Sequence, residues 1–124
     1  AYEIASCLVG SEMCKETPAA LLAADGTIYQ GCNIENASYT PTNCAERTAF
    51  FKAVSEGVRD FQAICIVGGK DGKLTEYTAP CGVCRQVMME MIKRHGDFDV
   101  ILIGKQQTVC LKASALMPFA FTLL

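Results

Sequence analysis

The sequence predicts a single α/β domain built on a mixed β-sheet. Short apolar runs rich in Ile, Val and Leu alternate with two longer amphipathic segments, as strands and helices do in a sheet-based domain. An Asp-Gly dipeptide between two apolar stretches indicates a β-hairpin. The chain has 124 residues, of which 51% are hydrophobic and 19% charged, and this is enough for one domain with its own core. The expected order is hairpin, helix, strand, helix, strand, strand.

The first half of the chain contains the hairpin and the first helix. Residues 18–35 form two apolar stretches around Asp25-Gly26, which predicts two antiparallel strands. Residues 36–43 have the composition of a loop. Residues 44–57 repeat apolar side chains at helical spacing and end at Gly57, so we expect an amphipathic helix that begins at a cysteine.

The second half supplies the remaining strands and the second helix. Residues 61–69 are rich in Ile and Val and end in glycines, as a buried central strand would. Residues 80–95 predict a helix with Pro80 near its first turn. Residues 98–104 predict another buried strand, and residues 107–113 an antiparallel edge strand. Together these segments predict five strands.

The composition excludes several classes of protein. A net charge of −2 and a pI near 5.3 argue against a nucleic-acid partner, because such proteins carry a basic surface. No apolar run approaches the roughly 20 residues that cross a membrane, and no secretory signal is evident, so we expect a cytoplasmic protein. Eight cysteines in a chain with long apolar segments indicate reduced thiols, some of them on a metal, rather than a disulfide scaffold.

The segment "PCGVCRQ", residues 80–86, places two cysteines three positions apart at the start of the second helix. This spacing suits both a redox dithiol and half of a metal site, because a helix N-terminus stabilises thiolates. A right-handed crossover between strand and helix units puts both helix N-termini at the same end of the sheet. Cys44, Cys81 and Cys84 can therefore converge on one point, as an anionic zinc–thiolate cluster requires.

Three protein ligands leave a fourth coordination position for water, which is typical of a catalytic zinc. Neither Cys32 nor Cys65 lies in a paired motif that would supply a fourth ligand to a structural zinc. Glu46 follows the first cysteine by two residues and is placed to act as a general acid and base on such a water. Three thiolates on Zn²⁺ carry a net negative charge, which the guanidinium of Arg47 would offset by donating to the sulfurs, with Arg85 in a similar role.

These motifs resemble those of the zinc-dependent cytidine deaminases, in the small form that uses three cysteines. "CAE" (44–46) and "PCGVC" (80–84) match the deaminase signature, with cysteine in place of its histidine. The resemblance extends to "GCNIENASY" (31–39) and "LMPFAF" (116–121) and covers the chain from about Ala19 onwards. It implies a three-layer α-β-α fold with a mixed five-stranded sheet and one Zn²⁺ per chain.

The resemblance also implies the reaction: hydrolytic deamination of cytidine and 2′-deoxycytidine to the uridine nucleosides and ammonia, a step of pyrimidine salvage. Cys44, Cys81 and Cys84 would bind the zinc. Glu46 would carry protons from the activated water to N3 of the cytosine ring and then to the departing amino group.

Further residues match substrate contacts of the family. Asn33 and Glu35 would hydrogen-bond the ribose 3′-hydroxyl, so a free nucleoside would be the substrate. The backbone N–H of Ala45 would hold the base carbonyl. Phe121 matches a C-terminal phenylalanine that reaches into the pocket of a neighbouring subunit, which implies a homotetramer.

Two other functions stay open at this stage. A deaminase of another aminated heterocycle, such as blasticidin S, would share the zinc chemistry, although the "NIE" stretch (33–35) favours a nucleoside. A CxxC thiol–disulfide oxidoreductase would explain residues 81–84 but leave Cys44 and Glu46 without a role; its metal content would be zero.

The first residues depart from the family pattern. The family has a helix here, followed by a segment with an aromatic residue near the nucleoside, whereas this chain has Lys15 or a near neighbour at that position. We therefore formulate the hypothesis that residues 1–15 are foreign sequence. Residues 1–124 as a whole are expected to be one deaminase domain.

Overall fold

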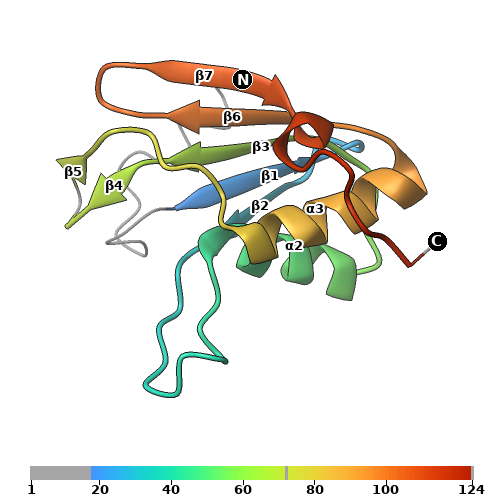
Figure 1. The fold of residues 1–124 in the computed structure, drawn as a ribbon, viewed down its shortest axis with the longest axis horizontal. Coiled ribbons are helices and arrows are strands. Elements are labelled where there is room, and N and C mark those ends of the chain that lie inside the picture. Colours follow the sequence, from blue (N-terminus) through green and yellow to red (C-terminus); the bar gives the residue numbers. More distant parts are fainter. Residues whose placement is uncertain (1–17, 72, 124) are drawn as a thin grey trace.

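Five strands form the main sheet, in the order β2-β1-β3-β6-β7 (Figure 1). The computed structural model describes residues 18–71 and 73–123. The strands are β1 (Ala19–Ala23), β2 (Ile28–Gly31), β3 (Phe61–Val67), β6 (Asp99–Ile103) and β7 (Thr108–Lys112). Strands β3 and β6 are parallel, and the other neighbouring pairs are antiparallel. The predicted mixed five-stranded sheet is confirmed.

The hairpin between β1 and β2 turns where the sequence predicts. Gly26 has a φ of 92°, a conformation that glycine adopts at little cost. The Asp25 carboxylate accepts a hydrogen bond of 2.9 Å from the backbone N–H of Thr27. A short-range polar contact of this kind stabilises the turn without help from the rest of the fold.

Two helices, α2 (Ala45–Ser55) and α3 (Gly82–His95), cover one face of the sheet (Figure 1). Their N-caps are Cys44 and Cys81, both in extended conformation with no side-chain capping hydrogen bond. Helix α2 is followed by Gly57 at a φ of 87°. Both predicted helices are confirmed to within two residues. No helix in the described part of the chain is long and apolar enough to span a bilayer.

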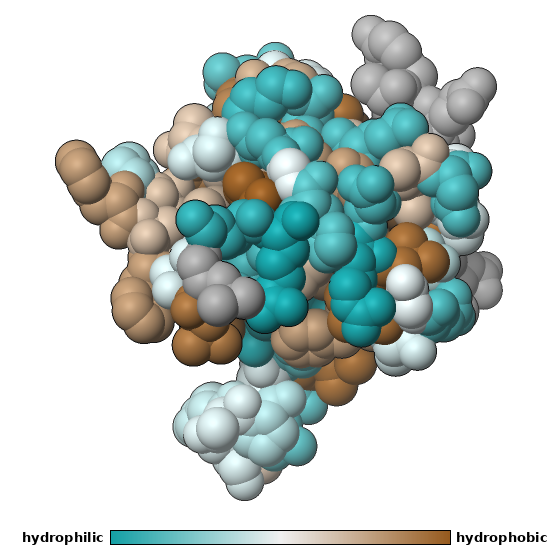
Figure 2. All heavy atoms as spheres, turned by 90° about the vertical axis from the view of Figure 1, so that its right-hand side faces the viewer, coloured by the Kyte–Doolittle hydropathy of each residue, from teal (hydrophilic) through white to brown (hydrophobic). Residues whose placement is uncertain are grey.

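Smaller elements lie outside the predictions. Strands β4 (Gly69–Lys70) and β5 (Lys73–Leu74) form a separate two-stranded ribbon, and a 3₁₀ helix η1 (Ala113–Leu116) follows β7 and contacts α3. Between β2 and α2 a loop projects from the body of the protein (Figures 1 and 2), and a single β-bridge between Ile34 and Asn43 closes its base.

The main core lies between the sheet and the two helices. Phe50 of α2 packs edge-on against Phe61, at a centroid distance of 5.3 Å, and also against Phe98, at 5.8 Å. Along β3 the side chains alternate, so that Ile64 and Ile66 join this core. The opposite face of the sheet carries a second apolar cluster, formed by Ala20, Ala63, Cys65, Val67 and Ile101. The helices α2 and α3 therefore pack on an apolar face that the strand pattern defines.

The described residues contain two of the three predicted layers, namely the sheet and the helices on one of its faces. The hypothesis of foreign sequence concerns residues 1–15, which lie outside the described residues.

Candidate metal centre and active site

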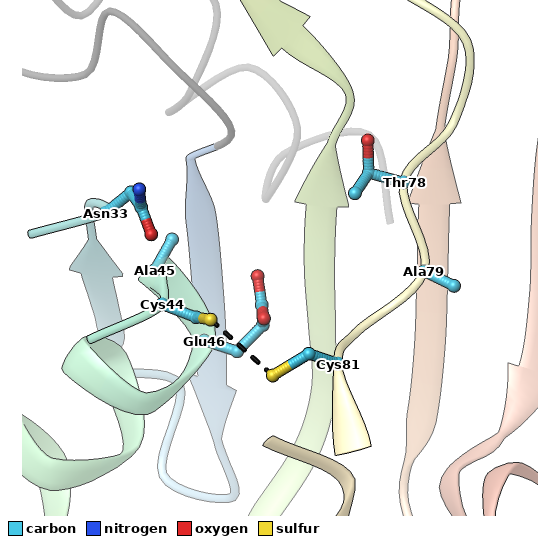
Figure 3. A pocket seen from close by; sticks show the side chains of 7 residues that line it. All are labelled: Asn33, Cys44, Ala45, Glu46, Thr78, Ala79 and Cys81. Atoms are coloured by element: carbon cyan, nitrogen blue, oxygen red, sulfur yellow. Dashed lines mark hydrogen bonds between the residues drawn. The ribbon is translucent and has the colours of Figure 1, made fainter. Parts of the chain in front are cut away.

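Three thiols meet at the N-termini of α2 and α3. Cys44 caps α2, Cys81 caps α3, and Cys84 lies in the first turn of α3. The sulfur of Cys81 is 3.6 Å from the sulfur of Cys44 and 3.6 Å from that of Cys84, and all three lie within 4.8 Å of one another. Figure 3 shows the side chains of Cys44 and Cys81 facing each other. The predicted convergence of the three cysteines is present in the structure.

The sulfur spacing fits a zinc ion. Tetrahedral coordination with Zn–S bonds of about 2.3 Å places two sulfurs about 3.8 Å apart. The observed separations of 3.6 Å are close to this value. A disulfide would bring the two sulfurs to about 2.05 Å, and all three cysteines are free thiols. The cluster therefore has the geometry of a metal site rather than of a redox pair.

The surroundings act differently on the three thiols. Burial raises the pKa of Cys81. Hydrogen bonds from the backbone N–H groups of Cys84 and Val83 and from the Cys44 thiol lower it by more, so the pKa of Cys81 lies below its usual value. The pKa of Cys84 is raised, chiefly by burial and then by the Glu46 carboxylate. Of these two thiols, that of Cys81 is therefore the more readily ionised.

Arg47 is the guanidinium that reaches the cluster. Its Nη2 lies 3.5 Å from the sulfur of Cys44 and 3.4 Å from the carbonyl oxygen of Thr42. The hydrogen bond to Cys44 is the main reason why the pKa of Arg47 is raised. Its Nε is buried and has no hydrogen-bond partner among the described residues. A positive charge in this position counteracts the charge of the thiolates.

Glu46 is the buried charged residue beside the thiols, with a side chain only 4% exposed. Burial raises its pKa, while a hydrogen bond from the Cys84 thiol acts in the opposite direction. Its carboxylate points into the pocket between the two helix ends (Figure 3). A buried carboxylate that faces a pocket is suited to exchange protons with a bound molecule.

The pocket next to the thiols has a volume of about 200 Å³. This is smaller than the pockets that hold drug-sized molecules. Its lining residues are Asn33, Cys44, Ala45, Glu46, Thr78, Ala79 and Cys81. Five of them were singled out from the sequence, whereas Thr78 and Ala79 were missed. The position of these two residues just before the "PC" of the second motif was the signal that could have found them.

Close backbone contacts hold the pocket walls in place. A Cβ on Gly31, at the end of β2, would lie 2.2 Å from the carbonyl oxygen of Ala45, so β2 touches the first turn of α2. A Cβ on Gly104, after β6, would lie 2.3 Å from the backbone nitrogen of Tyr77. The second contact places the segment that carries Thr78 across the end of the parallel strands. Glycine is needed at both positions, because any side chain would displace the opposite backbone.

The remaining predicted residues have different positions. Asn33 lines the pocket and donates a hydrogen bond from Nδ2 to Oε1 of the exposed Glu35. Phe121 is 76% exposed and does not belong to the pocket of its own chain. Arg85 donates from Nε to the carbonyl oxygen of Pro80 at 2.8 Å and from Nη1 to that of Leu116 at 3.0 Å. Its predicted contact with the cysteine sulfurs stays a prediction.

Three thiols at two helix N-termini, with a buried carboxylate beside them and a pocket in front, fit the class of zinc-dependent hydrolytic enzymes. Thiolates supply the negative charge that Zn²⁺ requires, and a buried carboxylate such as that of Glu46 is able to accept a proton in a hydrolytic reaction.

Comparisons with known proteins agree with this class. The family model described as "Cytidine and deoxycytidylate deaminase zinc-binding region" matches residues 4–95. The cytidine deaminases of Sporosarcina psychrophila and Halalkalibacterium halodurans are each 51% identical over 105 residues, which cover 84% of this chain and 73% and 75% of theirs. The chain belongs to the cytidine and deoxycytidylate deaminase family.

Solved structures support the same conclusion. The cytidine deaminase from Burkholderia pseudomallei is 39% identical, with a TM-score of 0.79 and coverage of 95% of both chains. The cytidine deaminase from Mycobacterium tuberculosis is 33% identical, with a TM-score of 0.64 over 86% of this chain and 79% of that one. The predicted fold class, the deaminase class of enzyme and the zinc cofactor are confirmed.

Proposed function

We propose that this protein hydrolyses the 4-amino group of cytidine and 2′-deoxycytidine, which yields uridine, 2′-deoxyuridine and ammonia. The observation that carries this proposal is the buried Glu46 carboxylate, which faces a small pocket at a cluster of three thiols. The relatives that match most of this chain are named cytidine deaminases, which supports the choice of substrate.

Cys44, Cys81 and Cys84 would hold the zinc. When bound, Zn²⁺ supplies Lewis-acid chemistry that makes a water molecule acidic enough to react at neutral pH. Glu46 would accept a proton from that water at its carboxylate oxygen and deliver it to N3 of the cytosine ring. Once the water oxygen has bonded to C4, Glu46 would take the remaining proton from this oxygen and give it to the amino group, so that the C4–N bond breaks, the C4 carbonyl forms and ammonia leaves. Because Glu46 is almost completely buried, bulk water does not compete for these protons.

We assign contacts to the nucleoside to the loop after β2 and to the start of α2. The hydrogen bond between Asn33 and Glu35 orients both side chains, and we assign the pair to the ribose 3′-hydroxyl. Ala45 is the first residue of α2, where backbone N–H groups have no partner within the helix. Its N–H is therefore available to the base carbonyl. Arg47, in contact with Cys44, would offset the net negative charge of zinc and three thiolates.

We propose that the protein forms a homotetramer in which Phe121 reaches the pocket of a neighbouring subunit. Large apolar side chains exposed on the described surface support this assembly. They include Ile34, Tyr39, Phe51, Val83, Phe119, Phe121 and Leu123. In Figure 2 hydrophilic side chains occupy the centre of the face shown, with hydrophobic ones around it. Sedimentation or light scattering of the purified protein measures the assembly, and a monomer would contradict it.

We further propose that the reaction belongs to pyrimidine salvage in the cytoplasm and that residues 1–124 are one domain. We propose that residues 1–15 are foreign sequence and that the chain is less stable and less active without the family's usual N-terminal helix. A thermal melt and an activity assay beside a variant that carries this helix test the second statement, which equal melting temperatures and equal activities would refute.

The decisive experiment compares Glu46→Gln with wild type in the zinc-loaded protein. Loss of the cytosine absorbance band and release of ammonia report the reaction. We expect the variant to lose about 10²- to 10⁴-fold in kcat, the range for one general acid and base, while zinc stays bound. Glu56→Gln, the same change at the other end of α2, is the control and should leave the rate unchanged.

A substrate panel completes the test. It contains cytidine, deoxycytidine, their nucleotides and blasticidin S. Activity on the free nucleosides supports the proposal, whereas activity on blasticidin S alone would contradict it. Full activity of Glu46→Gln would refute the mechanism.

A further inference from the structure

Helix α3 holds the C-terminal tail through three side chains that bind its backbone. Nη1 of Arg85 donates to the carbonyl oxygen of Leu116 at 3.0 Å, and Nε2 of Gln86 donates to that of Phe121 at 2.6 Å. One turn further on, Oε1 of Glu90 accepts a hydrogen bond of 2.9 Å from the N–H of Leu123. We call Arg85, Gln86 and Glu90 the tail clamp. Figure 1 shows the tail running beside α3 towards the C-terminus.

The tail clamp begins in the same helical turn as two zinc ligands. Cys84 directly precedes Arg85, and Cys81 lies four positions before it. The guanidinium of Arg85 also donates from Nε to the carbonyl oxygen of Pro80, at 2.8 Å, just before the first of these cysteines. One side chain therefore bridges the metal-ligand turn and the tail. Because a guanidinium is planar and presents several donors in fixed directions, it sets the distance between the two segments.

The tail depends on this clamp for its position. After η1 it has no helix or strand up to residue 123, so no backbone ladder fixes it. Leu116, Met117 and Ala120 pack against the core, but the ring of Phe121 projects outwards and is 76% exposed. Gln86 binds the carbonyl of Phe121 itself. An amide two residues beyond Cys84 therefore holds the backbone of the residue that carries this ring.

We propose that Arg85 and Gln86 are positioning residues that fix Phe121 relative to the zinc-ligand turn and thereby govern substrate affinity. The inference rests on the proposed function, in which Phe121 enters the pocket of a neighbouring subunit. It assigns Arg85 a geometric task, in contrast to a purely electrostatic effect on the thiolates. Neither residue takes part in the chemistry, so the clamp acts on KM and leaves kcat unchanged.

The first experiment removes one hydrogen bond. Gln86→Leu removes the amide donor and leaves a branched apolar side chain that is one bond shorter. We expect KM for cytidine to rise about fivefold, the value of one such hydrogen bond, with kcat within about twofold of wild type. Hydrogen exchange in the peptide that covers residues 117–123 should become faster. Gln62→Leu removes a similar amide hydrogen bond, from Nε2 to the carbonyl oxygen of Ala24, far from the tail and serves as the matched control, with KM and exchange in residues 117–123 unchanged.

A pair of variants at Arg85 separates geometry from charge. Arg85→Lys keeps the positive charge but cannot bind two carbonyl groups in the same way. A geometric role predicts that Arg85→Lys raises KM and tail exchange as much as Arg85→Gln does, with the pH profile of kcat unchanged in both. An electrostatic role predicts that Arg85→Lys behaves like wild type and that only Arg85→Gln shifts the pH profile. The second pattern would overturn the proposal.

A double-mutant cycle tests whether Gln86 acts through Phe121. In a Phe121→Ala background, Gln86→Leu should cause no further rise in KM. Additive effects on KM, or tail exchange that stays at the wild-type rate in Gln86→Leu, would refute the proposal. Zinc content and melting temperature are measured for every variant. Failure of wild type to deaminate cytidine would refute the proposed function alone, because the exchange measurements need no activity.

Discussion

Gly31→Ala is a small change that should displace the active site. Gly31 ends β2 and lies directly against the first turn of α2. An added Cβ would be 2.2 Å from the carbonyl oxygen of Ala45 and 2.7 Å from the backbone nitrogen of Ala49. Both atoms belong to the helix backbone, so no side-chain rotation can relieve the contact. The strand or the helix must therefore move.

The required movement can be estimated from these distances. Contacts of a Cβ below 3.0 Å essentially do not occur, so the carbonyl of Ala45 must recede by at least about 0.8 Å. Overpacking of this kind costs about 1–3 kcal/mol of stability. Glu46 follows Ala45 directly, and a misplacement near 1 Å in a catalytic group lowers the rate by about 10²-fold. We expect kcat/KM for cytidine to fall by about that factor.

The assay combines kinetics, zinc content and thermal unfolding. The control is Gly69→Ala, because a Cβ at Gly69 would lie 3.4 Å from the nearest atom, an ordinary contact. That variant should keep the melting temperature and the kcat/KM of wild type. If Gly31→Ala retained kcat/KM within about twofold and melted like wild type, the close contact between β2 and α2 would not be what positions Glu46.

Three further predictions concern the metal, the core and the pH dependence of stability. Cys84→Ser should abolish stoichiometric zinc binding and lower the melting temperature, because a thiolate site couples metal binding to folding. Metal analysis and calorimetry measure the two effects, and a normal zinc content would contradict the assignment of Cys84 as a ligand. Phe50→Ala should cost about 3–5 kcal/mol in urea unfolding, because the ring is fully buried against Phe61; a loss below about 1 kcal/mol would contradict this packing. Burial raises the pKa of Asp97, but hydrogen bonds from Ser114 and from a backbone N–H outweigh it and hold that pKa below its usual value of 3.8. The unfolded chain then binds more protons near that pH, so the stabilisation is present above pH 3.8 and is lost as the pH falls below it. Asp97→Asn should therefore lower the melting temperature at pH 7, and the difference should shrink below pH 3.8; an equal difference at both pH values would refute the assignment.

The hairpin and the helices could be predicted because their signals are local. The side chain of Asp25 bonds a backbone group two residues away, so the turn is encoded within a few positions. Helix α2 follows from the spacing of its apolar residues and from the glycine after its end. The small ribbon of β4 and β5 was missed, because two-residue strands are too short to show a pattern.

The metal site could be predicted for a different reason. Cys44 and Cys81 are 37 positions apart, yet each caps a helix that follows a strand. The handedness of strand–helix connections places such caps at the same end of a sheet. Their proximity could therefore be predicted although they are far apart along the chain. Thr78 and Ala79 were missed because they reach the pocket through the path of the backbone and carry no chemical signature.

The hydrogen-bond partners of Arg85 could not be predicted from the sequence. Its sequence position beside Cys84 suggests a contact with the sulfurs, whereas two of its nitrogens bind carbonyl groups of Pro80 and Leu116. A guanidinium offers five donors, and every residue of the chain offers a carbonyl oxygen. Which of these meet is decided by the packing of η1 on α3, a contact between segments about 30 positions apart.

The sequence by itself determined the chemistry of this protein: three thiols, one carboxylate and the helix starts that gather them, because motifs and periodicity are properties of neighbouring residues. Only the tertiary structure decided the walls of the pocket, the contact of Gly31 with α2 and the clamp on the tail. These features depend on distances between backbones that are remote along the chain, and such distances exist only after the core has packed.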